Sequence, residues 1–264
     1  FFFKQKTAYE IPKRDWNSDV CSSDLYKPRG HSNMKTAPVL AVLALGAAAA
    51  TAQAEVSSTI TLASDYDFRG ITQTARDPAL QASLDWSTES GFYLGAWASN
   101  VDFGDGTESD FELDLLGGLS GNFSVDVGYD IGLARYNYFA NGDDIDYTEY
   151  YLGLSFKALS VKYWYSSDFV NSGDGANYLE ANVDVPLPND FTATLHVGRS
   201  GGAFWADDKY TDYSVGVSKT VGNFDLGLKW VDGSDFKPGN NIGDANSSES
   251  RVIFTVATTL PWGK

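Results

Sequence analysis

The sequence predicts an all-β protein, a transmembrane, antiparallel, up-and-down β-barrel of about 12 strands. Three observations predict this fold. Apolar and polar residues alternate along most of residues 55–264, the connections between these runs are long and short in turn, and aromatic residues recur beside the short connections. Alternation with a period of two is the signal of strands whose two faces meet different surroundings.

The first 54 residues are expected to lie outside the barrel domain, which we place at 55–264. Met34 opens MKTAPVLAVLALGAAAATAQAE, which has one lysine, an apolar run and a small-x-small end at Ala52-Gln53-Ala54. This pattern is typical of a cleavable secretory signal peptide, here residues 34–54. Residues 1–33 are interpreted as a non-native leader. Back-translation of residues 1–25 gives DNA that resembles a sequencing adapter, so these residues look like translated adapter read-through. A genuine N-terminal extension is the alternative.

Composition excludes several classes of function for the expected mature chain. Residues 55–264 hold 12 Lys and Arg against 31 Asp and Glu, which gives a formal net charge of −19, and they contain no cysteine. This acidity argues against nucleic acid as a partner. A chain without cysteine has no disulfides and no thiol chemistry. His196 is the only histidine of residues 55–264, and these residues contain no GxSxG-like elbow, so we expect no enzyme, cofactor or metal site; a hydrolase that uses His196 is the alternative.

Twelve alternating runs are expected to be the strands. They lie at about residues 58–68, 79–88, 91–99, 110–119, 122–135, 147–157, 159–167, 177–186, 190–199, 210–220, 222–231 and 250–260. The short turns are expected at 88–91, 120–122, 157–159, 186–190 and 220–223, with longer loops between them. Short periplasmic turns and long external loops are typical of outer-membrane barrels. In a small soluble barrel, the alternative, the apolar face would instead point inward.

Aromatic residues beside the short turns are expected to form an interfacial girdle, because such rings favour the level of the lipid headgroups. This predicted girdle consists of Trp86, Phe92, Tyr93, Phe123, Phe156, Phe191 and Phe224.

Four segments carry a resemblance to a known family. They are SDYDFRGITQTARDPALQASLDWSTESGFYLGAWASNVDFG (64–104), YTEYYLGLSF (147–156), NYLEANVDVPLP (177–188) and YTDYSVGVSK (210–219). In these segments the chain resembles the TorF porin family of exported proteobacterial proteins. The resemblance implies an outer-membrane β-barrel, assembled by the barrel assembly machinery and surrounded by outer-membrane lipid. The chain departs from many such barrels at its end, since Lys264 rather than an aromatic residue is last.

The polar face of the strands is expected to line a pore. The predicted pore-lining residues are Asp65, Asp67, Arg69, Asp85, Glu112, Asp114, Asp126, Asp130, Glu149, Lys157, Lys162, Glu180, Asp184, His196, Asp225 and Lys229. Carboxylates outnumber basic groups in this set, which favours cations over anions. We therefore expect passive diffusion of small hydrophilic solutes with a preference for cations. A closed barrel that serves as a binding or structural surface protein is the alternative.

Two acidic, glycine-containing stretches are expected in the external loops. DFGDGTESD (102–110) and NGDDID (141–146) crowd carboxylates without the spacing of an EF-hand loop. They are interpreted as solvated loops, and bridging of these loops by external divalent cations is the alternative.

Overall fold

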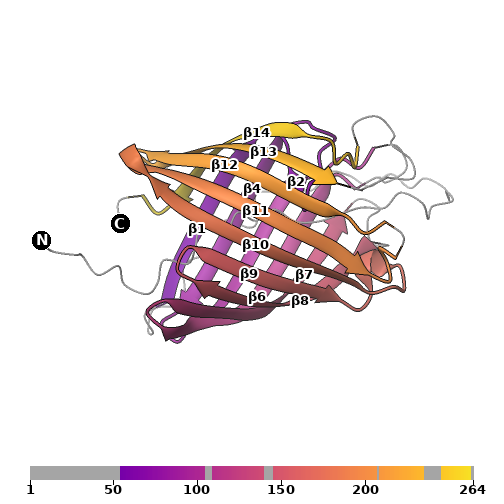
Figure 1. The fold of residues 1–264 in the computed structure, drawn as a ribbon, viewed down its shortest axis with the longest axis horizontal. Coiled ribbons are helices and arrows are strands. Elements are labelled where there is room, and N and C mark those ends of the chain that lie inside the picture. The colour runs from indigo at the N-terminus through magenta and orange to yellow at the C-terminus, as the bar shows by residue number, and fades with distance from the viewer. Residues whose placement is uncertain (1–53, 105–108, 140–144, 207, 235–244, 263–264) are drawn as a thin grey trace, which may run out of the picture.

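The computed structural model describes residues 54–104, 109–139, 145–206, 208–234 and 245–262. They form a closed barrel of twelve antiparallel strands, in the order β1-β14-β13-β12-β11-β10-β9-β8-β7-β6-β5-β4, as Figure 1 shows from the side. The strands are β1 (Ala54–Ala63), β4 (Ala79–Thr88), β5 (Phe92–Asn100), β6 (Phe111–Ser124), β7 (Val127–Phe139), β8 (Tyr147–Phe156), β9 (Leu159–Ser166), β10 (Ala176–Leu187), β11 (Phe191–Gly202), β12 (Thr211–Val221), β13 (Phe224–Ser234) and β14 (Arg251–Leu260). The predicted fold class is confirmed.

Each strand pairs with its sequence neighbours, and β1 closes the barrel by pairing with both β4 and β14. Because β1 starts and β14 ends at the same end of the barrel, the short connections lie there and the long ones lie opposite (Figure 1). We call these the short-turn end and the long-loop end. At the long-loop end Ala63 and Ala79 are direct partners across β1 and β4.

The outward face of the barrel is apolar along its strands. In β13, for example, Phe224, Leu226, Leu228 and Trp230 are exposed, whereas Asp225, Gly227 and Lys229 between them are partly buried. Exposed leucine, valine and aromatic side chains recur in the same way on the other strands. An apolar exterior around a polar interior is the arrangement of a barrel in lipid rather than in water.

No helix in the described part of the chain is long and apolar enough to cross a membrane. Two short 3-10 helices, η3 (Phe169–Asn171) and η4 (Pro188–Asp190), lie in connections between strands.

The hairpin of β6 and β7 turns later than the sequence predicted. Residues 120–122, the expected turn, belong to β6, and the connection lies instead between Ser124 and Val127, next to a register shift. Gly121 explains the extension, because a Cβ there would meet the ring of Tyr129, so glycine lets this ring lie across the neighbouring strand. Strand β6 is therefore longer than predicted at the short-turn end, whereas β7 begins later than predicted, at Val127.

The largest correction concerns the first predicted strand, 58–68. Strand β1 ends at Ala63, and residues 64–78, which we call the inner loop, fold into the barrel before β4 begins. Two short strands, β2 (Asp67–Phe68) and β3 (Ile71–Thr72), pair within this loop. Residues 64–69 alternate like a strand, yet Tyr66 and Phe68, and Ile71 after them, are fully buried, so their apolar side chains face protein and not lipid.

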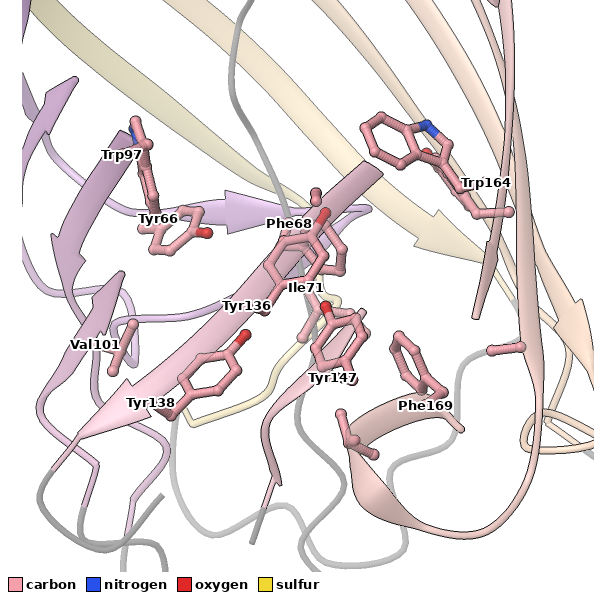
Figure 2. Packing of buried hydrophobic residues seen from close by; sticks show 14 of the residues in the cluster. Tyr66, Phe68, Ile71, Trp97, Val101, Tyr136, Tyr138, Tyr147, Trp164 and Phe169 are labelled. Carbon is pink, nitrogen blue, oxygen red and sulfur yellow. The ribbon is translucent and has the colours of Figure 1, made fainter. Parts of the chain in front are cut away.

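The inner loop packs against aromatic residues of the wall at the long-loop end. Figure 2 shows Tyr66 beside Trp97, and Phe68 and Ile71 between Trp97 and Trp164. The ring centroids of Tyr66 and Trp97 are 5.2 Å apart, in an edge-to-face arrangement that aromatic pairs favour. The core of this barrel is therefore built between the inner loop and the wall.

Candidate functional site in the barrel lumen

A tight turn presents Arg69 to the barrel wall. Phe68 and Ile71 pair across a two-residue turn, in which Arg69 and Gly70 have φ values of 46° and 86°. Two-residue hairpin turns of this kind need positive φ at both central positions, and glycine supplies one without strain. A Cβ at Gly70 would also come within 2.6 Å of the Asp212 Cβ, so glycine lets the turn approach β12. The sequence Arg69-Gly70 thus places a guanidinium at the tip of the inner loop.

Arg69 forms a buried, bidentate ion pair with Glu149 of β8. Its Nη1 and Nη2 donate to Glu149 Oε1 and Oε2 at 3.1 and 2.7 Å, and the two side chains are 4% and 0% exposed. The Tyr136 hydroxyl donates to Glu149 Oε2 at 3.2 Å. The Arg69 guanidinium also lies 4.1 Å from the centroid of the Tyr178 ring and 5.8 Å from that of Trp164. A buried charge of this kind is tolerated because it is both paired and hydrogen-bonded.

A second set of ion pairs fixes the other side of the inner loop. Arg251, at the start of β14, donates through Nε to Asp65 and through Nη2 to Asp67 Oδ1 at 2.6 Å. Lys229 Nζ of β13 donates to Asp67 Oδ2 at 3.0 Å. Lys229 and Arg251 together hold the pKa of Asp67 below its ordinary value of 3.8, although burial alone would raise it. The inner loop is therefore attached to both sides of the wall by charged groups.

A third cluster lies on β10, β11 and β12. His196 Nε2 lies 2.6 Å from Asp212 Oδ2 and 3.1 Å from the Tyr178 hydroxyl, and His196 Nδ1 lies 2.7 Å from Asn182 Oδ1. The Tyr178 hydroxyl donates to Asp212 at 3.0 Å. The hydrogen-bond partners of the histidine in this cluster are a tyrosine, an amide and a carboxylate. The cluster positions Tyr178 and gives this side of the lumen negative charge.

The predicted pore-lining residues divide into three groups. Those in the inner loop are Asp65, Asp67 and Arg69, which therefore belong to a segment inside the barrel and not to its wall. Those on the inward face of strands are Asp85, Glu112, Asp114, Asp130, Glu149, Lys162, Glu180, Asp184, His196, Asp225 and Lys229. Asp126 and Lys157 instead lie exposed in short turns, where the strands have ended, and this corrects the prediction for both.

Burial separates the wall residues by depth. Glu112 and Glu149 are 0% exposed and Asp114 is 5% exposed, because the inner loop and the tyrosines around it cover them. The remaining inward charged residues of the predicted set keep contact with solvent, and Asp184 is exposed near the short-turn end. Lys162, for example, bonds to Asp130 at 2.8 Å while both side chains stay partly exposed. Charged groups thus contact water between the inner loop and the short-turn end, but not beside the inner loop.

One girdle residue points the other way. Tyr93 is buried, and its hydroxyl donates to Asp130 at 2.6 Å and contacts the Tyr151 hydroxyl inside the barrel. The prediction is wrong here because Phe92 and Tyr93 are adjacent, and neighbours on a strand face opposite sides. The other predicted girdle residues lie on the outward face near the short-turn end: Trp86, Phe92, Phe123, Phe156, Phe191 and Phe224.

Sequence reasoning missed two important charged residues, Asp212 and Arg251. Both lie at the beginning of their strands and two residues before an inward-facing residue, Asp212 before Ser214 and Arg251 before Ile253. The alternation was therefore sufficient to place them in the lumen. Their role depends on the inner loop, whose position no local pattern reveals.

Within the described ranges no group of three or more His, Cys, Asp or Glu residues could hold a metal ion. Most of the acidic loop residues considered for divalent cations, including residues 105–108 and 140–144, lie outside the described residues. Asp102 bonds to the backbone N–H of Gly104, and Asp146 pairs with Arg135 at 3.1 Å. The predicted leader and signal peptide, apart from Ala54, also lie outside the described residues.

Comparison with known proteins adds the family and the fold. The model of Gcw_chp, a bacterial protein family of unknown function, matches residues 47–260. The chain belongs to the Gcw_chp family. No curated protein matches it at a significant level.

Solved structures of similar fold include two porins. The KdgM porin has a TM-score of 0.52 and 11% identity to this Gcw_chp chain, over 78% of this chain and 99% of that one. The NanC porin has a TM-score of 0.52 and 10% identity, over 78% and 98%. The structural similarity shows a shared porin-like barrel fold, and at identities this low it shows the fold alone. The TorF resemblance remains a prediction.

Proposed function

We propose that this protein is a non-enzymatic channel of the bacterial outer membrane that passes small hydrophilic solutes by diffusion and prefers cations. The observation that carries the proposal is the contrast between an apolar exterior and an inward face whose charged residues contact water below the inner loop. The porin-like fold supports it. In this proposal the inner loop narrows the lumen and limits the size of the solute.

Preference for cations follows from the sign of the inward charge. Among the described inward residues, carboxylates outnumber basic groups, and several basic groups are already paired. Low-dielectric walls focus such a charge along the axis of a pore and raise the local concentration of counter-ions. Small cations and neutral hydrophilic solutes are therefore the proposed substrates, and outer-membrane lipid is the proposed surroundings.

A closed barrel that acts as a binding or structural surface protein is the second candidate. It is favoured by the complete burial of Glu112 and Glu149 beside the inner loop. In that case the same polar lumen would be a filled core, and only the long-loop end would contact partners.

Conductance in planar lipid bilayers tests the two candidates. The wild-type protein is compared with a variant in which residues 64–78 are replaced by Asn-Gly, a two-residue turn that fits the direct pairing of Ala63 with Ala79. We expect small conductance steps for the wild type and larger steps for the variant. A silent wild type with a conducting variant would support the closed barrel, and silence of both proteins would contradict a channel.

A further inference from the structure

The surroundings of Arg69 have the features of a recognition site for an organic cation. Glu149 presents both carboxylate oxygens to the two terminal nitrogens of the guanidinium, at 3.1 and 2.7 Å. Aromatic rings of Tyr178 and Trp164 lie 4.1 and 5.8 Å from its central carbon. A planar carboxylate fork combined with aromatic faces suits guanidinium better than ammonium, because guanidinium is flat and carries paired donors.

The barrel wall supplies most of this site, and the inner loop supplies its occupant. Glu149, Trp164 and Tyr178 lie on β8, β9 and β10, and Trp164 and Tyr178 are direct partners across two strands. Only Phe68, 4.6 Å from the guanidinium, comes from the same loop as Arg69. Removal of the arginine side chain would therefore leave the contacting groups themselves in the chain, and three of them belong to the wall.

The wall residues are held in position by bonds that do not involve Arg69. The Tyr136 hydroxyl donates to Glu149 at 3.2 Å, and Trp164 Nε1 donates to Glu180 at 2.8 Å. The Tyr178 hydroxyl donates to Asp212 at 3.0 Å. Such supporting bonds fix the orientation of a site before its ligand arrives, which is the requirement for specific recognition.

We propose that Glu149, Trp164 and Tyr178 form a binding site for solutes that carry a guanidinium group, and that Arg69 occupies this site from within the chain. The Arg69 side chain is then an internal competitor that a solute of the same chemistry displaces. The proposal rests on the proposed channel function only for the route by which a solute reaches the site. Binding itself requires a folded barrel and no conductance.

Binding to the purified barrel in detergent micelles tests this site separately from conductance. The probes are arginine amide, which carries a guanidinium, and citrulline amide, its uncharged urea analogue, and the readout is tryptophan fluorescence. In Arg69→Ala the vacated site should bind arginine amide saturably, at least about tenfold more tightly than citrulline amide, because the analogue lacks the charge-assisted bonds. Wild-type protein should bind more weakly than Arg69→Ala, because its own arginine competes.

Two further variants are the controls. Arg76→Ala removes another arginine of the inner loop, one that bonds to Ser247 and Glu249 and not to Glu149, and it should create no binding. Arg69→Ala combined with Glu149→Gln keeps the vacated space but removes the carboxylate, and it should abolish the preference for arginine amide. Equal binding of both amides to Arg69→Ala, or unchanged binding in the double variant, would overturn the proposal.

Refolding provides a second measurement in case Arg69→Ala folds poorly alone. Arginine amide should then restore the barrel of Arg69→Ala, seen as a shift in gel mobility on heating, and citrulline amide should not. The double variant should gain nothing from arginine amide. Equal yields of Arg69→Ala with the two amides would contradict the site, whatever the conductance of the wild-type protein.

Discussion

At the scale of single residues, the lumen depends on glycines that let large rings lie against the wall. Gly198 of β11 is the clearest case, because a Cβ at this position would overlap the Tyr178 ring and hydroxyl. The Tyr178 hydroxyl is also held by a bond to Asp212, and the ring lies over the Arg69 guanidinium. A methyl group at Gly198 therefore displaces a ring that has no free direction in which to move.

We predict that Gly198→Ala lowers the free energy of unfolding by about 1–3 kcal/mol, the usual cost of overpacking a filled interior. Gly216→Ala on the next strand is the matched control, because its Cβ would meet no atom closer than 3.6 Å. Urea unfolding of both variants in lipid vesicles measures the difference. Equal costs would show that the Tyr178 ring is not packed against β11 as described.

At the scale of elements, the sequence was sufficient for the strands of the wall and insufficient for the inner loop. Residues of the wall alternate between lipid and lumen, and this alternation predicted all twelve strands within a few residues. Residues 64–69 alternate as well, with Tyr66 and Phe68 between Asp65, Asp67 and Arg69. A period of two records only that two faces differ, so it cannot tell a lipid face from the packed interior of a barrel.

The attachment of the inner loop should depend on pH through Asp67. Its pKa in the folded protein is lowered below 3.8 by Lys229 and Arg251, so its contribution to stability is present above this value and is lost as pH falls through the lowered pKa. His196 also lies near enough to lower this pKa, and Asp65 shares Arg251. Asp67 is therefore ionised and paired at pH 5 and 7.

We predict that the inner loop stays attached at pH 5 and is released as the pH falls through the pKa of Asp67, which Lys229 and Arg251 hold below 3.8. Conductance steps recorded at pH 7, 5 and 3 measure release as an increase confined to the lowest value. Asp67→Asn, which cannot ionise, should show part of this increase already at pH 7. Steps that are equal at all three pH values in both proteins would show that Asp67 does not attach the loop.

At the scale of the whole molecule, position in the barrel decides which carboxylates can act on a passing ion. The sequence predicted an excess of inward carboxylates but could not show which of them the inner loop covers. Glu112 and Asp114 are buried beside the loop, whereas Asp85, Asp184 and Asp225 keep contact with water. In the proposed channel only groups near the ion path would raise the local cation concentration strongly, and the Tyr138 hydroxyl already bonds to the buried Glu112.

We predict that the open channel selects potassium over chloride and that Asp85, Asp184 and Asp225 carry this selectivity. The triple variant to asparagine should therefore move the reversal potential under a KCl gradient toward zero, while Glu112→Gln with Asp114→Asn should leave it almost unchanged. Salt limits the effect, because the Debye length falls from about 30 Å at 0.01 M to about 3 Å at 1 M. Selectivity should thus be strong in dilute salt and weaken as salt rises. An anion-selective wild type, or equal effects of the two variants, would contradict the assignment of the ion path to the solvent-exposed carboxylates.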